Sequence, residues 1–340
     1  MVTGFAASNR PQSGNLLSIR REPRVEVDTF AIAFPVVDVD TTGATVTTQG
    51  YGTPNTIVSG KRPLEGGGFL AWGRGGMAWA EASLPKRFDG QNVSALRWEE
   101  ALDAGEALYR EAAAWCELDR AREGHKFERS KVVRIDLVRD FEGVADVSWL
   151  LDGLAGVRQK GRVGTKRFSD RERGGSATLS AGNAAWLCTL YDKFAESLGA
   201  DGSEPGHLRF EARCRQRLLQ SAGAVMAGGK VERVGDLSEV KAAGMRRQQY
   251  RRVGFDREVV TSARLVDVVA AAPDLTPRAR RELWAYLTLP DPGFSRPVVR
   301  KYAAIAADLG VTARVDGWEG PKVSVSLDYD AGVQRVERAA

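Results

Sequence analysis

The stretch VVRIDLVRDFEG, residues 132–143, alternates between apolar and polar side chains, which predicts a β-strand with one buried face. Ile135 and Leu137 fall on one side of this strand, whereas Arg134 and Asp136 fall on the other. Such alternation is typical of antiparallel sheets that bury one face and leave the other polar. The stretch therefore predicts an antiparallel sheet with charged side chains on its outer face.

Two later segments repeat the pattern. Between Trp186 and Lys193, an apolar face of Trp186, Cys188 and Leu190 leaves Thr189, Tyr191 and Lys193 on the opposite side. Between His207 and Arg213, an apolar face likewise leaves three charged side chains opposite: Arg209, Glu211 and Arg213. If the three strands are neighbours that pack on the amphipathic helix expected at 98–118, their polar faces bring four groups together: Asp136, Glu211, Tyr191 and Lys193.

That combination of groups is suited to phosphoryl transfer. Two carboxylates can hold Mg²⁺ or Mn²⁺, hard ions that prefer oxygen ligands and keep several waters. A tyrosine oxygen and a lysine beside a metal-polarised phosphodiester complete such a site. The alternative is an ordinary solvated sheet surface, because polar outer faces are common in antiparallel sheets.

The same segments, taken in order, resemble a known family. VVRIDLVRDFEG (132–143), LYDK (190–193) and LRFEAR (208–213) are similar to the replication initiation factor family, the rolling-circle initiators of small plasmids and filamentous phages. In that family an R-[IL]-D-L-x-x-D-F strand is followed by a Y-[ND]-K strand and then by an R-x-E strand. Residues 178–182 loosely resemble the strand that usually precedes Y-[ND]-K. The similarity covers residues 24–220.

The resemblance implies a chemistry. Tyr191 would attack a DNA phosphate, form a 5′-phosphotyrosine and free a 3′-hydroxyl that primes the host polymerase. Asp136 and Glu211 would be the ligands of Mg²⁺ or Mn²⁺, and Lys193 would orient the phosphate or stabilise developing charge. For Arg134, Arg209 and Arg213, two roles stay open: DNA phosphate contacts or ion pairs on the sheet surface.

The fold that the resemblance implies is α+β. It is a five-stranded antiparallel sheet with helices on one face, as in the endonucleases named for a His-hydrophobe-His metal motif. This sequence has no His-x-His. Asp140 is a further candidate ligand, with a loop salt bridge as the alternative. His207 is another, although a ring stacked at the start of its strand is the reading we favour.

The texture of the chain changes after residue 223. We expect a flexible arm at 1–23, the nicking and joining domain at 24–222, and a mainly helical DNA-binding domain at 230–340. Helices expected at 276–287 and 295–309, joined by a proline-bearing turn, fit a helix-turn-helix or winged helix that reads duplex DNA through Arg296, Arg300 and Lys301. A helical packing module with a solvated basic face fits equally well.

Composition excludes several other classes of protein. Of the 340 residues, 43% are hydrophobic and 27% are charged, which argues against disordered and fibrous chains. No apolar run approaches the ~20 residues of a membrane-spanning helix, and 1–18 lacks a secretory pattern. The three cysteines form no C-x-x-C pair, which suits a reducing compartment. We therefore expect a cytoplasmic protein that makes no contact with membranes.

Basic side chains are concentrated in two stretches of the chain. Residues 156–176 hold seven Lys or Arg and two acids, and residues 209–252 hold eleven and four. Such concentration is what binding to phosphates requires, although solvated helix faces produce it too. The expected partners are origin DNA, as a single-stranded nick site with flanking duplex, a host helicase and polymerase, and optionally a second copy in a homodimer.

Three functions remain open at this level. The first is a metal-dependent replication initiator that nicks and rejoins DNA through Tyr191. The second is a sequence-specific DNA-binding regulator that has the sheet but no chemistry. In the third, Tyr191 is a core side chain and a metal-bound water hydrolyses DNA.

Overall fold

The computed structural model describes most of the chain between residues 24 and 338. The described residues are 24–49, 57–73, 75–90, 94–144, 147, 150–151, 154, 164–169, 177–197, 204–221, 229–255, 259–260, 269–272, 275–288, 293–309 and 323–338. The predicted arm at 1–23 lies outside them. So does most of the basic stretch at 156–176.

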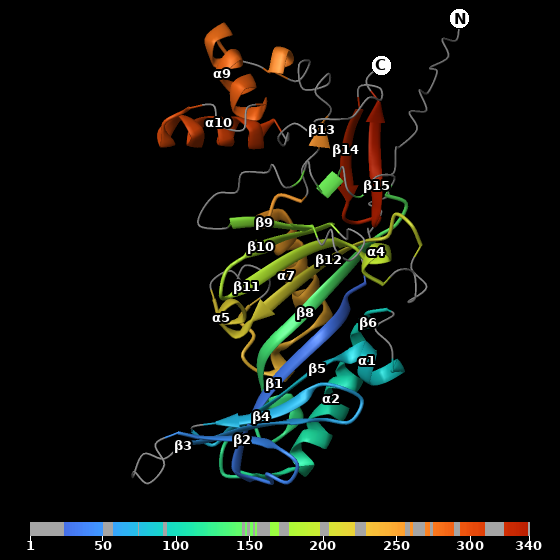
Figure 1. Cartoon of the computed structure of the whole chain (residues 1–340), viewed down its shortest axis with the longest axis vertical. Helices are drawn as coiled ribbons and strands as arrows, with labels where there is room; N and C mark the ends of the chain where they lie inside the picture. Colours follow the sequence, from blue (N-terminus) through green and yellow to red (C-terminus); the bar gives the residue numbers. More distant parts are fainter. Residues whose placement is uncertain are drawn as a thin grey trace, which may run out of the picture.

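A large antiparallel sheet organises the molecule (Figure 1). Its strands follow the order β2-β3-β4-β5-β1-β8-β12-β11-β10-β9, and the short β6 and β7 also pair with β1. Their bounds are β1 Glu26–Val39, β2 Thr45–Gln49, β3 Ile57–Pro63, β4 Phe69–Gly73, β5 Met77–Ser83, β6 Leu96–Arg97, β7 Cys116–Leu118, β8 Lys131–Phe141, β9 Gly164–Ser169, β10 Ala177–Gly182, β11 Trp186–Asp192 and β12 Leu208–Arg215. The expected α+β class is confirmed, although this sheet has twelve strands where five were expected.

The helices against the sheet cover one of its faces. Helix α2 (Trp98–Ala114) packs on β1 and β5, where a Cβ on its Gly105 would lie 2.9 Å from the ring of Phe30. Helix α7 (Glu239–Arg252) packs on β8 and β12, and its Tyr250 stacks on Phe141 with ring centroids 5.9 Å apart. Phe30 lies on the same face as Ile135, because the two are partners in the β1–β8 register. Phe141 also lies on that face, because it is an even number of residues from Ile135 along β8. We call this the apolar face and the opposite one the polar face.

Short helical elements complete this part of the fold. They are α1 (Leu84–Asp89), α4 (Lys193–Ser197), α5 (Gln216–Leu219) and the 3-10 turns η1 (Phe127–Arg129) and η3 (Val234–Asp236). Helix α1 contacts α2, β1 and β5, and α5 contacts β8 and β12. Among the described residues, no helix is long and apolar enough to cross a membrane.

Helix α7 is joined to the sheet by a buried arginine. Arg246 is fully buried; its Nη1 donates to the Val138 carbonyl and its Nε donates to the Tyr329 hydroxyl at 2.7 Å. Val231, Val234 and the buried side chains of α7 belong to the same hydrophobic cluster as the sheet. The helical segment predicted as a separate domain at 230–340 therefore contributes α7 to the core of the sheet.

A second hydrophobic cluster lies farther along the chain. It gathers side chains from α9 (Pro277–Thr288) and α10 (Arg296–Asp308), with Leu283 and Tyr302 fully buried in it. A three-stranded antiparallel sheet contains β13 (Val259–Val260), which precedes α9 in the chain, and β14 (Val323–Asp328) and β15 (Val333–Arg338), which follow α10. Strands β14 and β15 pair antiparallel within this third of the chain, which was predicted as mainly helical.

Candidate functional site

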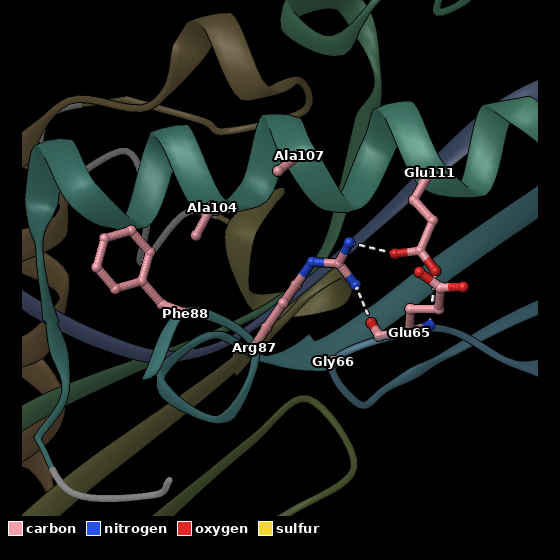
Figure 2. Close-up of a pocket in the computed structure, with 7 residues that line it drawn as sticks. All are labelled: Glu65, Gly66, Arg87, Phe88, Ala104, Ala107 and Glu111. Atoms are coloured by element: carbon pink, nitrogen blue, oxygen red, sulfur yellow. Dashed lines mark hydrogen bonds and ion pairs between the residues drawn. The ribbon is translucent and has the colours of Figure 1, made fainter. Parts of the chain in front are cut away.

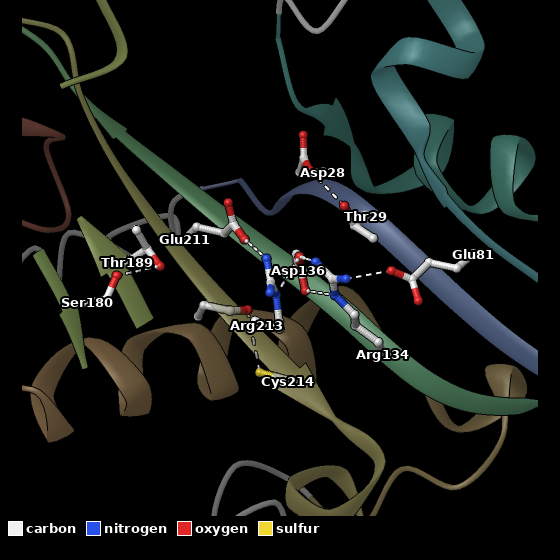
Figure 3. Close-up of polar contacts among 11 residues, drawn as sticks. Asp28, Thr29, Glu81, Arg134, Asp136, Ser180, Thr189, Glu211, Arg213 and Cys214 are labelled. Carbon is white, nitrogen blue, oxygen red and sulfur yellow. Dashed lines mark hydrogen bonds and ion pairs between the residues drawn. The ribbon is translucent and has the colours of Figure 1, made fainter. Parts of the chain in front are cut away.

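The two predicted metal ligands lie on adjacent strands of the polar face. Asp136 of β8 is the register partner of Arg213 of β12, and Glu211 of β12 is the partner of Val138. Directly opposed residues share a face, so Asp136, Arg213 and Glu211 project on the same side. Figure 3 shows them converging on one patch of backbone. The two carboxylates therefore lie on one face of adjacent strands, as the sequence predicted.

Asp136 is held by two arginines. The Asp136 side chain is 1% exposed. Arg134 forms a bidentate ion pair with it: Nε donates to Oδ1 at 2.8 Å, and Nη2 donates to Oδ2. Arg213 donates from Nε to Oδ2 at 3.3 Å. Arg134 also bonds Glu81 of β5, so the ion pairs run across β5, β1 and β8. Asp136 keeps acceptor capacity, since a carboxylate has about four lone-pair sites and three N–H groups occupy it.

Glu211 is in an environment that disfavours its charged form. The pKa of Glu211 is raised to about 7, first by burial and then by the nearby carboxylates of Asp136 and Asp28, against the opposing effect of Arg213. Arg213 bonds Glu211 from Nη2 to Oε1 at 3.2 Å. Like charges that share a site favour either a proton or a cation between them. The polar face thus carries an excess of negative charge at this point.

Tyr191 lies on the same face, on the next strand. It is the register partner of Arg209 on β12, two register positions from the Thr189–Glu211 pair. Its side chain is half-buried. Burial raises the pKa of Tyr191 well above its usual range, Glu211 and Asp28 add to this, and Arg209 lowers it. Tyr191, Glu211 and Asp136 therefore occupy one face of three consecutive strands, although the phenol is held in its protonated form.

Arg209 and Asp140 form a separate clamp. Arg209 is 2% exposed and donates to Asp140 from Nε at 2.7 Å and from Nη2 at 2.8 Å. The His207 Nε2 lies 3.3 Å from the Asp140 Oδ2. These contacts lower the pKa of Asp140 far below its usual range, against the opposing effect of burial. Of the two roles predicted for Asp140, the salt bridge is the one observed, and His207 contacts it instead of stacking at the strand start.

The predicted DNA contacts of the sheet arginines are corrected by the same geometry. Arg134, Arg209 and Arg213 all bind carboxylates of this chain. Of the two roles left open for them, ion pairs on the sheet are therefore the one observed. Arg209 in particular is too deeply buried to reach a DNA backbone.

Lys193 differs from its predicted position on the strand face. Strand β11 ends at Asp192, and Lys193 begins α4, where its backbone N–H donates to the His207 carbonyl. The side chain is 2% exposed and its Nζ donates to Glu196 at 2.9 Å. Its predicted place beside Tyr191 in a row of alternating strand residues was wrong, because the strand is one residue shorter than the pattern indicated.

The Asp136–Glu211 pair meets some of the needs of a hard divalent cation. Within the described ranges, no group of three or more His, Cys, Asp or Glu side chains is arranged to hold a metal ion. The Asp136–Glu211 pair offers carboxylate oxygens, the ligands that Mg²⁺ and Mn²⁺ prefer, with waters for the remaining positions. The raised pKa of Glu211 reports a repulsion that such a cation would relieve. The pair fits a cation that is bound mainly through water.

The predicted duplex-reading residues lie on α10. Arg296, Arg300 and Lys301 are all exposed near the beginning of this helix, and Lys301 lies over the ring of Tyr302 at 5.1 Å. Their exposure is compatible with both alternatives, a DNA reader and a solvated helix face. Their role therefore stays a prediction.

Two acids of the site were missed in the sequence. Asp28 belongs to β1, where it accepts from the Thr29 hydroxyl at 2.8 Å, and Glu81 belongs to β5. The order β5-β1-β8 was not predicted, because nothing in a local pattern fixes which distant strands become neighbours.

A hollow of about 420 Å³ lies between α1 and α2, away from these acids (Figure 2). It is lined by Phe88, Ala104 and Ala107, and Arg87 spans its wall. Arg87 donates to the Glu65 carbonyl at 2.8 Å and forms an ion pair with Glu111. The Arg87 guanidinium at this hollow is therefore already bound by the Glu65 carbonyl and by Glu111.

Comparisons with known proteins place the chain at a distance from them. No protein-family model matches it, and no curated protein matches it. Among solved structures, a rolling circle replication initiator protein from Geobacillus stearothermophilus is 14% identical, over 60% of this chain and 83% of that chain, with a TM-score of 0.32. A likeness at that level carries no argument about activity. The functional argument therefore depends on the residues of this chain.

Proposed function

We propose that this protein initiates rolling-circle DNA replication by nicking one strand at an origin through Tyr191 and later rejoining it. The observation that supports the proposal is the placement of Tyr191, Glu211 and Asp136 on one face of three consecutive strands, β11, β12 and β8. These are the three segments whose order resembles the replication initiation factor family. A phenol on the same sheet face as two carboxylates is the minimum set for a covalent phosphoryl transfer.

The step is an exchange of one phosphoester for another. The Tyr191 oxygen bonds to phosphorus, the bond from phosphorus to the 3′-oxygen breaks, and the phenolic proton leaves to water. The products are a 5′-phosphotyrosine and a free 3′-hydroxyl, and the reverse exchange rejoins the strand. Arg209, opposite Tyr191, stabilises the phenolate because its positive charge lowers the pKa of that phenol.

Asp136 and Glu211 would hold Mg²⁺ or Mn²⁺, which supplies Lewis-acid polarisation of the phosphate when bound. Glu211 must be ionised to act as a ligand, so nicking should increase as pH rises through about 7. Lys193 would contact the phosphate only after its Nζ releases the Glu196 carboxylate. Origin DNA, a host helicase and a polymerase are the partners that this activity requires, with a homodimer as an option and the cytoplasm as its site.

The experiment uses a randomised pool of single-stranded DNA, since the origin sequence is unknown. Protein is incubated with the 3′-labelled pool and Mn²⁺, and the mixture is run on an SDS gel. A labelled protein band is expected, because the 3′ fragment stays on the tyrosine. With a 5′-labelled pool, the released fragments should be extended by a polymerase.

Tyr191→Phe should abolish the adduct, and peptide mapping should place it on Tyr191. The matched control is Tyr286→Phe in the second cluster, which should keep full adduct formation. A wild-type protein that cleaves without any adduct would replace the tyrosine mechanism with hydrolysis by a metal-bound water.

A second function is favoured by two observations. Tyr191 has a strongly raised pKa and Asp136 is already paired with two arginines, as in a sheet that binds DNA without cutting it. In that case the protein is a sequence-specific DNA-binding regulator. Selection of bound sequences from the random pool, with no cleavage under any divalent cation, would identify it.

A further inference from the structure

A row of five side chains crosses the polar face away from the candidate site. Register partners link it strand by strand through β3, β4, β5, β1 and β8: Lys61, Ala71, Trp79, Ala33 and Lys131. Directly opposed residues share a face, so the row places one tryptophan between two alanines and two lysines. Four interstrand spacings of ~4.8 Å make it roughly 19 Å wide.

The floor of this row is open on one side of the tryptophan. Ala71 is buried, whereas Ala33 and Trp79 are partly exposed. Beyond Ala33 a hollow of about 340 Å³ continues over Pro35 and Met77, which are partners in the β1–β5 register. Small and apolar side chains thus form the base of a trough that begins beside the Trp79 ring.

The rim of the trough is basic. Four cations and two carboxylates line the hollow: Arg122, Arg129, Lys131 and Arg233, with Glu123 and Glu232. Arg233 is paired with Glu123, and Arg122 donates to the carbonyls of Gly75 and Gly76. Within the part of the chain that the structure describes, the side chains of Arg129 and Lys131 have neither an ion pair nor a hydrogen bond, and both are exposed. Two positive charges are therefore available to an anionic ligand.

We infer that this trough binds single-stranded DNA, with a base stacked on Trp79 and phosphates bound by Arg129 and Lys131. Proteins that bind single-stranded DNA combine aromatic rings with cations. The bases stack on the rings, and the charged phosphates contact the cations. A duplex hides its bases and cannot stack on Trp79. The occupant is therefore an unpaired strand.

The trough and the candidate site share strand β8. Lys131 and Asp136 lie five residues apart on β8, ~17 Å at about 3.3 Å per residue. One DNA strand can therefore lie across both, and the trough would fix the strand while the scissile phosphate is at Tyr191. The inference rests on the proposed function only in taking DNA as the polymer, because binding in the trough needs no nicking.

The test is fluorescence anisotropy with labelled single-stranded oligo-dT in EDTA, so that no cleavage intervenes. The double variant Arg129→Gln with Lys131→Gln should weaken binding on the order of tenfold at low salt. The slope of log affinity against log salt should fall by ~1.4, because each phosphate contact to a single strand contributes ~0.7. Trp79→Leu should weaken binding about fivefold or more, and Trp79→Phe should retain most of it.

The matched control removes the same charge from the other face. Lys86→Gln with Arg110→Gln changes exposed residues of α1 and α2, and should leave affinity and salt slope nearly unchanged. Equal losses in both double variants would overturn the inference, because only net charge would then matter. So would displacement of oligo-dT by equal amounts of duplex DNA or polyglutamate, or tighter binding of oligo-U RNA.

If Trp79→Leu fails to fold, the double variant on the exposed rim still decides the question. A protein that binds oligo-dT through the trough but forms no Tyr191 adduct would refute the proposed function and leave this inference standing. If the protein forms Tyr191 adducts but the double variant binds oligo-dT as tightly as the wild type, this inference is refuted and the proposed function stands.

Discussion

Arg213 lies between the two carboxylates that were expected to bind metal, with its Nε 3.3 Å from Asp136 and its Nη2 3.2 Å from Glu211. The guanidinium therefore occupies the electrostatic position that a divalent cation would take. It is itself 26% exposed, so it can swing toward solvent at a smaller cost than Arg134, which is bound on both sides. Arg213 and a metal ion are competitors for the same pair of acids.

Arg213→Gln should raise the affinity of the protein for Mn²⁺ several-fold. Removal of the competing positive charge leaves Glu211 and Asp136 with their mutual repulsion, which a divalent cation relieves. Titration calorimetry with Mn²⁺ at pH 8 measures the change. Arg215→Gln, an exposed change two residues along the same strand, is the control. Identical Mn²⁺ affinity in all three proteins would discard the Asp136–Glu211 pair as a metal site.

Asp136→Asn should lower the free energy of unfolding by about 3–5 kcal/mol, because it leaves the half-buried Arg134 without its main partner. Urea unfolding followed by circular dichroism measures it. Arg110→Gln, which removes one member of an exposed ion pair on α2, should cost about 1 kcal/mol or less. Similar losses for the two variants would mean that the Asp136 network contributes no more than a surface pair.

Glu211 should make the protein less stable as pH rises from about 4.5 to about 7. Its pKa is raised on folding, so the native state binds more protons than the unfolded chain in this window. The stabilising contribution is complete below the unfolded pKa of 4.5 and is lost as pH passes the folded value of about 7. The loss amounts to about 3 kcal/mol from this shift.

Glu211→Gln cannot titrate, so its advantage over the wild type should grow by that amount between pH 4.5 and pH 8. Urea unfolding across this range provides the comparison, and Glu26, which also has a raised pKa, remains in both proteins and cancels. A difference in stability that is constant with pH would contradict the assignment.

The faces of the three motif strands could be predicted because the signal is local. Alternation with a period of two places Asp136, Glu211 and Tyr191 each on the polar side of its own strand, opposite the apolar residues. Adjacency of β8, β12 and β11 followed from the resemblance. The end of β11 was misplaced by one residue, since Lys193 continues the alternation while its backbone already turns into α4.

The rest depended on long-range pairing. The contact between Glu81 and Arg134 joins residues 53 positions apart, and no local pattern specifies it. Helix α7 was assigned to another domain because helical patterns replace strand patterns after residue 223, and its buried side includes the polar residues Arg246 and Gln249. Arg246 is satisfied by the Val138 carbonyl and the Tyr329 hydroxyl, partners that only the fold brings within reach.

The fourteen residues of β1 join the trough strand β5 on one side to the acid-bearing β8 on the other. A chain shortened from its beginning past residue 26 would therefore lose the middle of the sheet and not a peripheral edge. The same deletion would separate the surface proposed to nick DNA from the surface proposed to hold the strand. Both activities should accordingly disappear at one truncation point, however gradually the preceding residues are removed.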